Sequence, residues 1–176
     1  VVKTLYNLDK SHHASAFYYI NEDKSKFDHA FSFAITRNPY MRLYSAYNYL
    51  KNGGMNKIDR AWWELYLAQY ENFNAFILEG GLEFAIENNA EHFIPQYKFI
   101  FDENEDLQCN YVGKVEQIDE VELALSKQLQ KEVMFTHNNV MSKQEAIIEN
   151  LFSNDMLAIV NKCYQKDFSL LNYKKI

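Results

Sequence analysis

The sequence predicts an α/β fold in which a mainly parallel sheet is flanked by helices. Residues 31–36 form a continuous, mostly apolar run bounded by turn residues, which is typical of a strand buried on both faces of a parallel sheet. A capped helical pattern follows this run directly, and a second short strand candidate later in the chain also precedes a helical pattern. We therefore expect strand–helix units rather than a purely helical scaffold.

Length and composition indicate one globular domain over residues 1–176. The chain has 48% hydrophobic and 24% charged residues, and its 13 Phe, 13 Tyr and 2 Trp provide large apolar side chains for a core. A chain of this size buries roughly 70% of the surface that its unfolded form exposes. Intrinsic disorder, collagen-like repeats and a coiled-coil rod are therefore excluded.

The first part of the chain is expected to hold two helices, a loop and the buried strand. Val1–Leu8 has apolar residues at helical spacing and starts abruptly, which indicates a helix whose beginning is missing. Ser15–Ile20 is a short helix candidate, and Asn21–Lys26 is a polar loop. The strand follows at Phe31–Thr36.

The next helix has clear signals at both ends. Asn38 is a good N-cap, Pro39 suits the first helical position, and the pattern stops at the Asn-Gly-Gly sequence of residues 52–54. The expected packing face carries Tyr40, Leu43, Tyr47 and Leu50. The opposite, polar face carries Asn38, Arg42, Ser45 and Tyr49.

The remaining elements are expected to be mostly helical. A helical pattern over residues 58–88 is broken at Gly80-Gly81. Two short strands, 97–101 and 110–115, are expected on either side of an acidic turn at 102–106. Amphipathic helices are expected over 118–131 and 154–167.

Charge argues against broad binding of anionic partners. The formal net charge is −6, so the surface as a whole does not attract nucleic acid or an anionic membrane, and any anion must be bound locally. The chain has only three arginines, Arg37, Arg42 and Arg60, and the first two lie within six consecutive residues. This pair marks the place where a local anion site is expected.

Cysteine and histidine usage indicates neither a disulfide framework nor a metal site. Cys109 and Cys163 are far apart, and the five histidines form no His-x-x-x-His pair. The sequence contains no apolar run of about 20 residues, no secretory leader and no Asn-x-Ser/Thr sequon. A cytoplasmic protein without a bound metal and without a membrane span in this chain is the expectation.

The strand-to-helix junction at residues 33–47 is the strongest candidate site. Ligands of open α/β sheets bind at the carboxyl ends of strands, and helix N-termini present free N–H groups to anions. Arg37 lies at this point and can grip a phosphate with two N–H groups, and Ser45 can donate a hydroxyl from the helix. The alternative is that Arg37 and Arg42 form structural ion pairs and that Ser45 only fills the helix face.

Residues 37–47, Arg-Asn-Pro-Tyr-Met-Arg-Leu-Tyr-Ser-Ala-Tyr, support the first interpretation. This stretch resembles the 3′-phosphate-binding segment of the carbohydrate sulfotransferases that use 3′-phosphoadenosine 5′-phosphosulfate, the branch that includes heparan sulfate 2-O-sulfotransferase. Weaker matches keep the order of that family. They are Lys-Ser-His-His-Ala-Ser-Ala at 10–16, His-Phe-Ile-Pro-Gln at 92–96, a strand and Glu at 111–118, a loop at 139–143, and a closing helix and tail at 164–173.

The resemblance implies a P-loop nucleotide-kinase-like, three-layer domain and in-line transfer of a sulfuryl group to a hydroxyl, expected to be that of a carbohydrate. By similarity, Arg37 and Ser45 bind the 3′-phosphate of the nucleotide co-substrate, and no metal is required. His13 matches a histidine that acts in relatives as the general base, with His12 as the alternative. The ordinary pKa of histidine, near 6.5, suits that role.

One part of the family pattern is missing. The Lys-containing 5′-phosphosulfate loop is expected before the histidines and does not occur, nor does a Gly-x-x-x-x-Gly-Lys-Ser/Thr motif. The hypothesis is that this loop and the first strand precede Val1. If they do not, the alternative is a noncatalytic module that binds the nucleotide or a protein partner. A separate alternative concerns location: a membrane anchor upstream would favour the Golgi lumen over the cytoplasm.

Other candidate sites are weaker. The acidic turn at 102–106 could hold a hard cation, but it lacks the spacing of an EF-hand loop, and a solvated turn is the preferred interpretation. Trp62 and Trp63 are expected mainly in the core, with stacking on a sugar as the alternative. Gln96 and Lys114 are expected to line the acceptor or nucleotide side.

Overall fold

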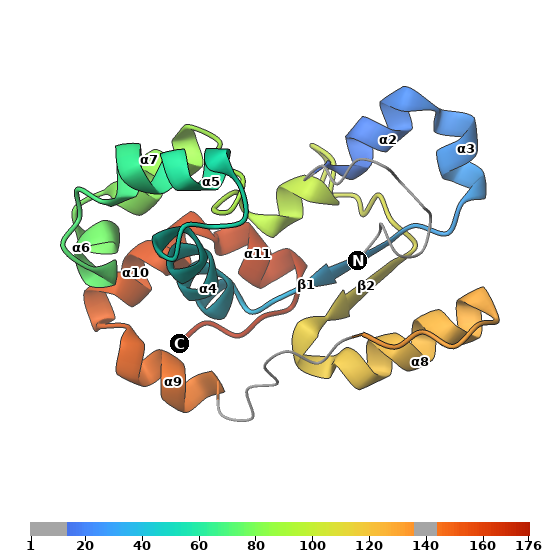
Figure 1. Cartoon of the computed structure of the whole chain (residues 1–176). Coiled ribbons are helices and arrows are strands. Elements are labelled where there is room, and N and C mark those ends of the chain that lie inside the picture. The colour runs from blue at the N-terminus through green and yellow to red at the C-terminus, as the bar shows by residue number, and fades with distance from the viewer. Residues whose placement is uncertain (1–13, 136–143) are drawn as a thin grey trace.

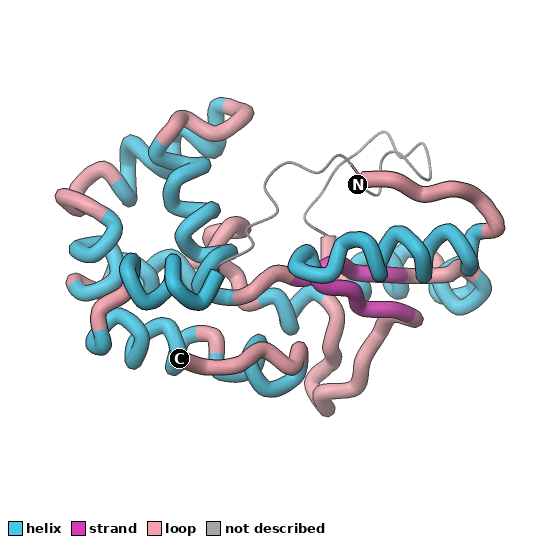
Figure 2. Tube along the Cα trace, turned by 90° about the horizontal axis from the view of Figure 1, so that it is seen from below, coloured by secondary structure: helices cyan, strands magenta, loops and turns pink. Residues whose placement is uncertain are grey.

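The computed structural model describes residues 14–135 and 144–176 (Figure 1). Helices from the middle and the C-terminal part of the chain gather on one side of the molecule. Two strands and one long helix lie on the other side, where a view turned by 90° shows the helix running along the strand pair (Figure 2). The structure thus combines helices with a small parallel sheet, and the predicted α/β class is confirmed.

Two short helices, α2 (Ala16–Glu22) and α3 (Lys24–His29), precede the sheet. Helix α2 confirms the first short helix that was expected in this region. The polar loop predicted over Asn21–Lys26 is wrong, because Asp23 ends α2 and caps α3. Its carboxylate accepts a hydrogen bond from the amide of Lys26 at 3.0 Å, which allows a second helix to begin at once.

The sheet of the described residues consists of two parallel strands. Strand β1 (Phe33–Thr36) pairs with β2 (Tyr111–Lys114), and the register places Thr36 opposite Lys114. Both strands were predicted, with slightly wider bounds. Because the pair is parallel, the carboxyl ends of both strands lie at the same edge of the sheet.

The strand predicted over residues 97–101 is wrong. A 3-10 helix, η2 (Gln96–Phe99), occupies most of this stretch, and only Phe101 forms an isolated antiparallel bridge, to Leu107. The amides of Gln96 and Tyr97, at the start of this segment, donate to the Asp167 carboxylate and are therefore not available to a neighbouring strand. The acidic turn itself lies between Phe101 and Leu107, as predicted.

Helix α4 (Pro39–Lys51) follows β1 as predicted. The side chain of Asn38 caps it by accepting hydrogen bonds from the first free amides of the helix. At the other end, Gly53 and Gly54 have φ of +89° and +59°, a region that favours glycine. The predicted packing face is buried: Tyr40, Leu43, Tyr47 and Leu50.

The helical middle of the chain is divided more often than the sequence indicated. It contains α5 (Lys57–Trp62), the π-helical turn η1 (Trp63–Leu67), α6 (Phe73–Leu78) and α7 (Gly81–Glu87). The predicted break is found at Gly80, which has φ of +84°. A further break follows Leu67, and beyond it α6 packs against α7 and α10.

The last part of the described chain is also helical. The 3-10 turn η3 (Val115–Gln117) leads from β2 into the predicted long helix α8 (Ile118–Leu129). Helix α9 (Gln144–Leu151) was not predicted. The helix predicted over residues 154–167 is divided into α10 (Asn154–Cys163) and α11 (Gln165–Leu170).

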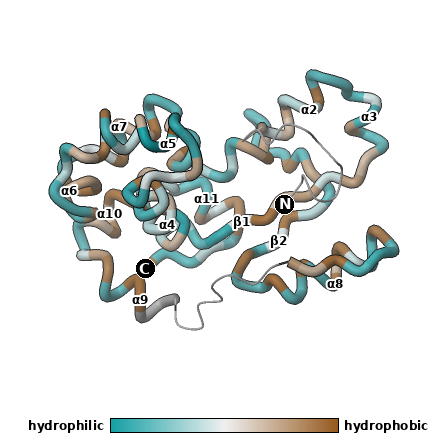
Figure 3. Tube along the Cα trace, in the orientation of Figure 1, coloured by the Kyte–Doolittle hydropathy of each residue, from teal (hydrophilic) through white to brown (hydrophobic). Residues whose placement is uncertain are grey.

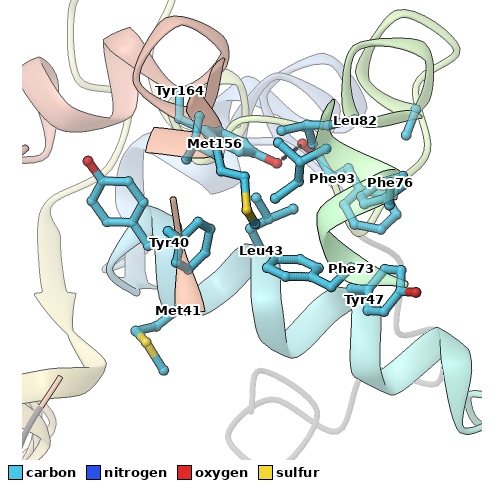
Figure 4. Close-up of a cluster of buried hydrophobic side chains, with 14 of the residues drawn as sticks. Tyr40, Met41, Leu43, Tyr47, Phe73, Phe76, Leu82, Phe93, Met156 and Tyr164 are labelled. Carbon is cyan, nitrogen blue, oxygen red and sulfur yellow. Dashed lines mark hydrogen bonds between the residues drawn. The ribbon is translucent and has the colours of Figure 1, made fainter. Parts of the chain in front are cut away.

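The main core is aromatic and lies around α4 (Figure 4). Tyr47 contacts the rings of Phe73 and Phe76 at centroid distances of 5.1 and 5.4 Å. The buried hydroxyl of Tyr164 donates to the carbonyl oxygen of Phe93 at 2.9 Å and ties α10 to the segment before η2. Helix α4 is therefore fixed on the face opposite to its polar side chains.

A smaller apolar cluster lies between α8 and the sheet. Val121, Leu125 and Val133 are buried there, with Phe33 and Ile35 of β1 packed against them. Figure 3 shows the hydrophobic stretch along β1 and the alternation of hydrophobic and hydrophilic positions along α8. The carboxyl edge of the sheet thus lies between two packed regions.

Candidate functional site

The strand-to-helix junction lies at the carboxyl edge of the sheet, as the sequence predicted. Thr36 ends β1, and Arg37 and Asn38 connect it to α4. The side-chain oxygen of Asn38 accepts hydrogen bonds from the amides of Tyr40 and Met41 at 3.0 and 3.4 Å. Strand end and helix N-terminus therefore meet at Arg37.

The main chain of Arg37 is bound by the side chain of Gln96. The amide of Arg37 donates to Oε1 of Gln96 at 2.9 Å, and Nε2 of Gln96 donates to the carbonyl oxygen of Arg37 at 2.8 Å. Gln96 was expected to line the acceptor or nucleotide side. Instead it is buried, and its side chain binds the backbone of the junction.

Gln96 is in turn held by a buried carboxylate that the sequence did not single out. Asp167 of α11 is fully buried, and its two oxygens accept hydrogen bonds at 2.8 Å from the amides of Gln96 and Tyr97. Burial raises the pKa of Asp167, whereas these two hydrogen bonds and the charge of Arg42 act in the opposite direction. The support of the junction therefore reaches the C-terminal helices.

Glu116 binds the next peptide group of the junction. Its Oε1 accepts from the amide of Asn38 at 2.8 Å, and its Oε2 accepts from the hydroxyl of Tyr173 at 3.2 Å. The same hydroxyl lies 3.1 Å from Oγ1 of Thr36. Burial raises the pKa of Tyr173, and the neighbouring Glu116 charge acts in the same direction, so the phenol stays protonated.

Lys114, the other residue expected to line the site, holds the C-terminal tail. Its Nζ donates to the carbonyl oxygen of Asn172 at 2.7 Å and lies 4.4 Å from the centroid of the Tyr173 ring. The ammonium group thus combines a hydrogen bond with a cation–π contact. Both strand ends and the tail are thereby joined at one edge.

The polar groups around Arg37 are hydrogen-bonded, but Nε of its guanidinium is not. This nitrogen is buried and has no hydrogen-bond partner within the described residues. Burial lowers the pKa of Arg37, while the nearby Glu116 acts to raise it. No ion pair of Arg37 or Arg42 occurs between residues that the structure describes. A partly buried cation with an unpartnered, buried N–H is suited to an anionic ligand.

Arg42 and Ser45 lie on α4 and are both partly buried. The charge of Arg42 reaches the buried Asp167 and Tyr164, whose pKa values it acts to lower, against the dominant effect of burial. Ser45 lies two helical turns from the junction. Its hydroxyl makes no hydrogen bond to another residue within 14–135 and 144–176.

A second polar cluster was not predicted. Asp59 accepts hydrogen bonds from the hydroxyl of Tyr49 at 2.6 Å and from the amide of Met55 at 3.0 Å, and His92 lies 3.1 Å from its other oxygen. Burial acts to raise the pKa of Asp59, but these contacts outweigh it and lower the pKa to about 2. Only the position of Tyr49 on the polar face was visible in the sequence.

The weaker candidate sites have structural explanations. In the acidic turn, Asp102 accepts hydrogen bonds from the amides of Asn104 and Asp106 at 2.9 and 2.8 Å, as in a solvated Asx turn. Trp63 packs on Tyr47 and Trp62 on Tyr66, and both are partly buried against the main core. Across the described parts of the chain, no group of three or more metal-ligating side chains occurs.

Several predicted features fall outside the described residues. They are the helix at Val1–Leu8, the proposed base His13 with its neighbour His12, and the loop at 139–143. Arg37 and Ser45, the predicted phosphate ligands, are described, the first at the junction and the second two helical turns along α4. The interpretation of all of these as site residues stays a prediction.

Within the described ranges, no helix is both long enough and apolar enough to span a membrane. A comparison with protein families finds that the family described as "Sulfotransferase family" matches residues 3–174. No curated protein and no solved structure matches the chain.

Proposed function

The chain belongs to the sulfotransferase family, and from this premise we propose that it transfers a sulfuryl group from 3′-phosphoadenosine 5′-phosphosulfate to a hydroxyl of a carbohydrate. The proposal includes a P-loop-like, three-layer arrangement and the branch that includes heparan sulfate 2-O-sulfotransferase. The lysine loop for the 5′-phosphosulfate, expected upstream of Val1, is part of the same proposal. The encoded sequence before Val1 tests it directly.

The buried and unpartnered Nε of Arg37 supports this function most strongly. A buried guanidinium N–H without a hydrogen-bond acceptor is costly, whereas a phosphate would accept two parallel N–H groups from the guanidinium. The group sits beside the N-terminus of α4, a 13-residue helix whose positive end favours an anion. The residues present therefore fit the 3′-phosphate of the nucleotide.

The roles of the individual side chains follow from their chemistry. Arg37 would bind and orient the 3′-phosphate, and Ser45 would donate its hydroxyl to a phosphate oxygen. His13 would accept the proton of the attacking hydroxyl, which requires a neutral imidazole. The nucleotide supplies the activated sulfuryl group, and catalysis would come mainly from positioning and from cationic groups around it.

Calorimetric titration with adenosine 3′,5′-bisphosphate tests the phosphate site. Arg37→Ala should weaken binding by on the order of 1.5–3 kcal/mol, because a charge-assisted contact to the phosphate is lost. Arg60→Ala is the matched control, since Arg60 is exposed on α5 and its removal changes the net charge equally. Equal affinities of the wild type and Arg37→Ala would contradict the site.

Turnover with the sulfuryl donor and a panel of carbohydrate acceptors tests catalysis. His13→Ala should abolish transfer while leaving nucleotide binding intact, and His29→Ala, at an exposed position on α3, should not change the rate. Residual transfer in His13→Ala with loss of transfer in His12→Ala would move the base to His12. Nucleotide binding without transfer to any acceptor would favour the noncatalytic module.

A reducing compartment is also proposed. Cys109 and Cys163 are both free thiols, and burial raises the pKa of Cys163 to about 11, which keeps it protonated and unreactive. These thiols fit the cytoplasm. Location of the tagged full-length protein in a secretory compartment would contradict this.

A further inference from the structure

We propose that Gln96 is a positioning residue of the phosphate site, which acts through the main chain of Arg37 and so sets the affinity for the nucleotide. The proposal rests on the function proposed above and adds a residue that makes no contact with the ligand itself. It predicts that an amide buried in η2 controls binding at the strand-to-helix junction.

The first observation is the pairing of the Gln96 side-chain amide with both main-chain polar groups of one residue, Arg37. Its oxygen accepts from the Arg37 amide at 2.9 Å, and its nitrogen donates to the Arg37 carbonyl oxygen at 2.8 Å. Only a side chain with one donor and one acceptor can make both bonds. Gln96 thus replaces, at the end of β1, the ladder partner that a further strand residue would have.

The second observation is that Gln96 is itself fixed. Asp167 is fully buried and accepts from the Gln96 amide at 2.8 Å, and the Gln96 side-chain nitrogen lies 3.4 Å from the same oxygen. The side chain therefore has little freedom to move away from the junction. Its support comes from α11, which packs against η2.

The third observation is that the peptide group between Arg37 and Asn38, whose carbonyl oxygen accepts from Gln96, is also bound at its N–H by a second side chain. The amide of Asn38 donates to Glu116 at 2.8 Å, and Glu116 follows β2. Two side chains from separate elements therefore fix the backbone of two consecutive residues. The Arg37 side chain leaves this fixed backbone with its Nε still unpartnered.

The consequence for binding is geometric. A bidentate contact to phosphate depends on the position and direction of the guanidinium fork, and the backbone of Arg37 fixes the point and direction from which this side chain extends. Displacements of about 1 Å at such groups cost up to about a hundredfold in function. Loss of the Gln96 side-chain amide would leave the main chain of Arg37 free to move. Ordering this main chain on binding would then reduce the free energy of nucleotide binding.

The test is a double-mutant cycle in which the affinity for adenosine 3′,5′-bisphosphate is measured by ligand-observed NMR. This method also measures weak binding. Gln96→Met keeps the length of the side chain and removes both hydrogen bonds, and it should weaken binding roughly tenfold. In an Arg37→Ala background the same change should have little further effect, because the group through which it acts is gone. A general loss of structure would not produce this dependence on Arg37.

Matched variants separate the possible outcomes. Gln69→Met is the control, because Gln69 donates a single side-chain hydrogen bond, to Tyr66, in another part of the molecule. If Gln96→Met does not fold, Gln96→Glu is used. It keeps an acceptor for the Arg37 amide but loses the donor to the carbonyl, and it should also weaken binding.

Failure of the inference differs from failure of the proposed function. If the wild type does not bind the nucleotide, the proposed function is overturned and the inference with it. If the wild type binds and Arg37→Ala binds more weakly, an unchanged affinity of the Gln96 variants overturns the inference alone. Equal effects of Gln96→Met with and without Arg37 also overturn it.

Discussion

The segment from His92 to Tyr97 is anchored near each end by a buried aspartate, and the two carboxylates differ in protonation behaviour. At the first end, Asp59 lies beside His92 and has its pKa lowered to about 2. At the other end, Asp167 accepts the amides of Gln96 and Tyr97 and has its pKa raised. The strand-to-helix junction, where we propose the phosphate site, is supported by the second end, at which the carboxylate charge is less well compensated.

The difference follows from burial and from the donors. Asp59 is 5% exposed and receives a phenol O–H and a backbone N–H on one oxygen and contacts an imidazole with the other. Asp167 is 0% exposed and receives only amide N–H groups. Equal numbers of contacts therefore do not stabilise the ionised form of a carboxylate equally. Complete desolvation can raise the pKa by more than neutral amide donors lower it.

The largest loss of stability is expected from a substitution that places a methyl group against Asp59. In Gly54→Ala the new methyl group would lie 2.2 Å from Cβ of Asp59, and φ at this position is +59°. The substitution should lower the free energy of unfolding by about 3 kcal/mol, measured by urea denaturation. Gly53→Ala, with φ of +89° and no atom within 4 Å, should lose only about 1 kcal/mol. Similar losses in both variants would contradict the close packing at Asp59.

A smaller effect is expected from removing the Asp59 charge. Asp59→Asn should lower the free energy of unfolding by about 2 kcal/mol at pH 7, because hydrogen bonds to an ionised acceptor are lost. The pKa of Asp59 is below its ordinary value of 3.8, so its contribution is present above about pH 4 and is lost as the pH falls toward 2. Denaturation of both proteins at several pH values should show the difference shrinking over that window. A difference that grows on acidification would contradict the lowered pKa.

Tyr49→Phe should have a weaker effect of the same kind. It removes the hydroxyl that donates to Asp59 at 2.6 Å and should cost about 1 kcal/mol. The loss of this donor should also raise the pKa of Asp59, which NMR titration of the carboxyl measures. Tyr66→Phe is the control, because the ring contacts of Tyr66 with Trp62 and Phe84 do not involve its hydroxyl.

The smallest effect on the free energy of unfolding is expected from the titration of Asp167. Its direction with pH is opposite to that expected for Asp59. Its pKa is raised, so the native carboxyl still binds a proton at pH values where the unfolded one has ionised. Stability should therefore fall slightly as the pH rises from 3.8 into this window, opposite to the effect of Asp59. Asp167→Asn should remove this slope. An unchanged slope would assign the pH dependence to other groups.

The same comparison shows what the sequence could and could not predict. The junction was predictable because strand, cap and helix follow one another and depend on local signals, from Phe33 to Gly54. The role of Gln96 was not, because its partners Arg37 and Asp167 are distant in sequence and no local pattern identifies a side chain that binds a backbone. For the same reason the Asp59 cluster was missed, since only tertiary packing brings Tyr49 and His92 to it.

One error in secondary structure has a related cause. Residues 97–101 alternate like a strand, but the buried Asp167 carboxylate takes the first amides of this segment and produces a 3-10 turn. The C-terminal helix was predicted as continuous, and the structure divides it at Tyr164, where φ is −108° and ψ is 25°. At residues 97–101, tertiary hydrogen bonds therefore overrode the local pattern.

The long connections at the junction have a kinetic consequence. Its hydrogen bonds join residues separated by 59, 78 and 137 positions, for Arg37 with Gln96, Asn38 with Glu116 and Thr36 with Tyr173. Contacts between residues so far apart in sequence form late in folding. The entropy cost of closing a long loop must be met before the contact contributes any stabilisation. Synthesis proceeds from the N-terminus, so Thr36 and Arg37 leave the ribosome long before their partners exist. The phosphate site should be among the last parts to become native, and nucleotide added during refolding should stabilise finished molecules without speeding their formation.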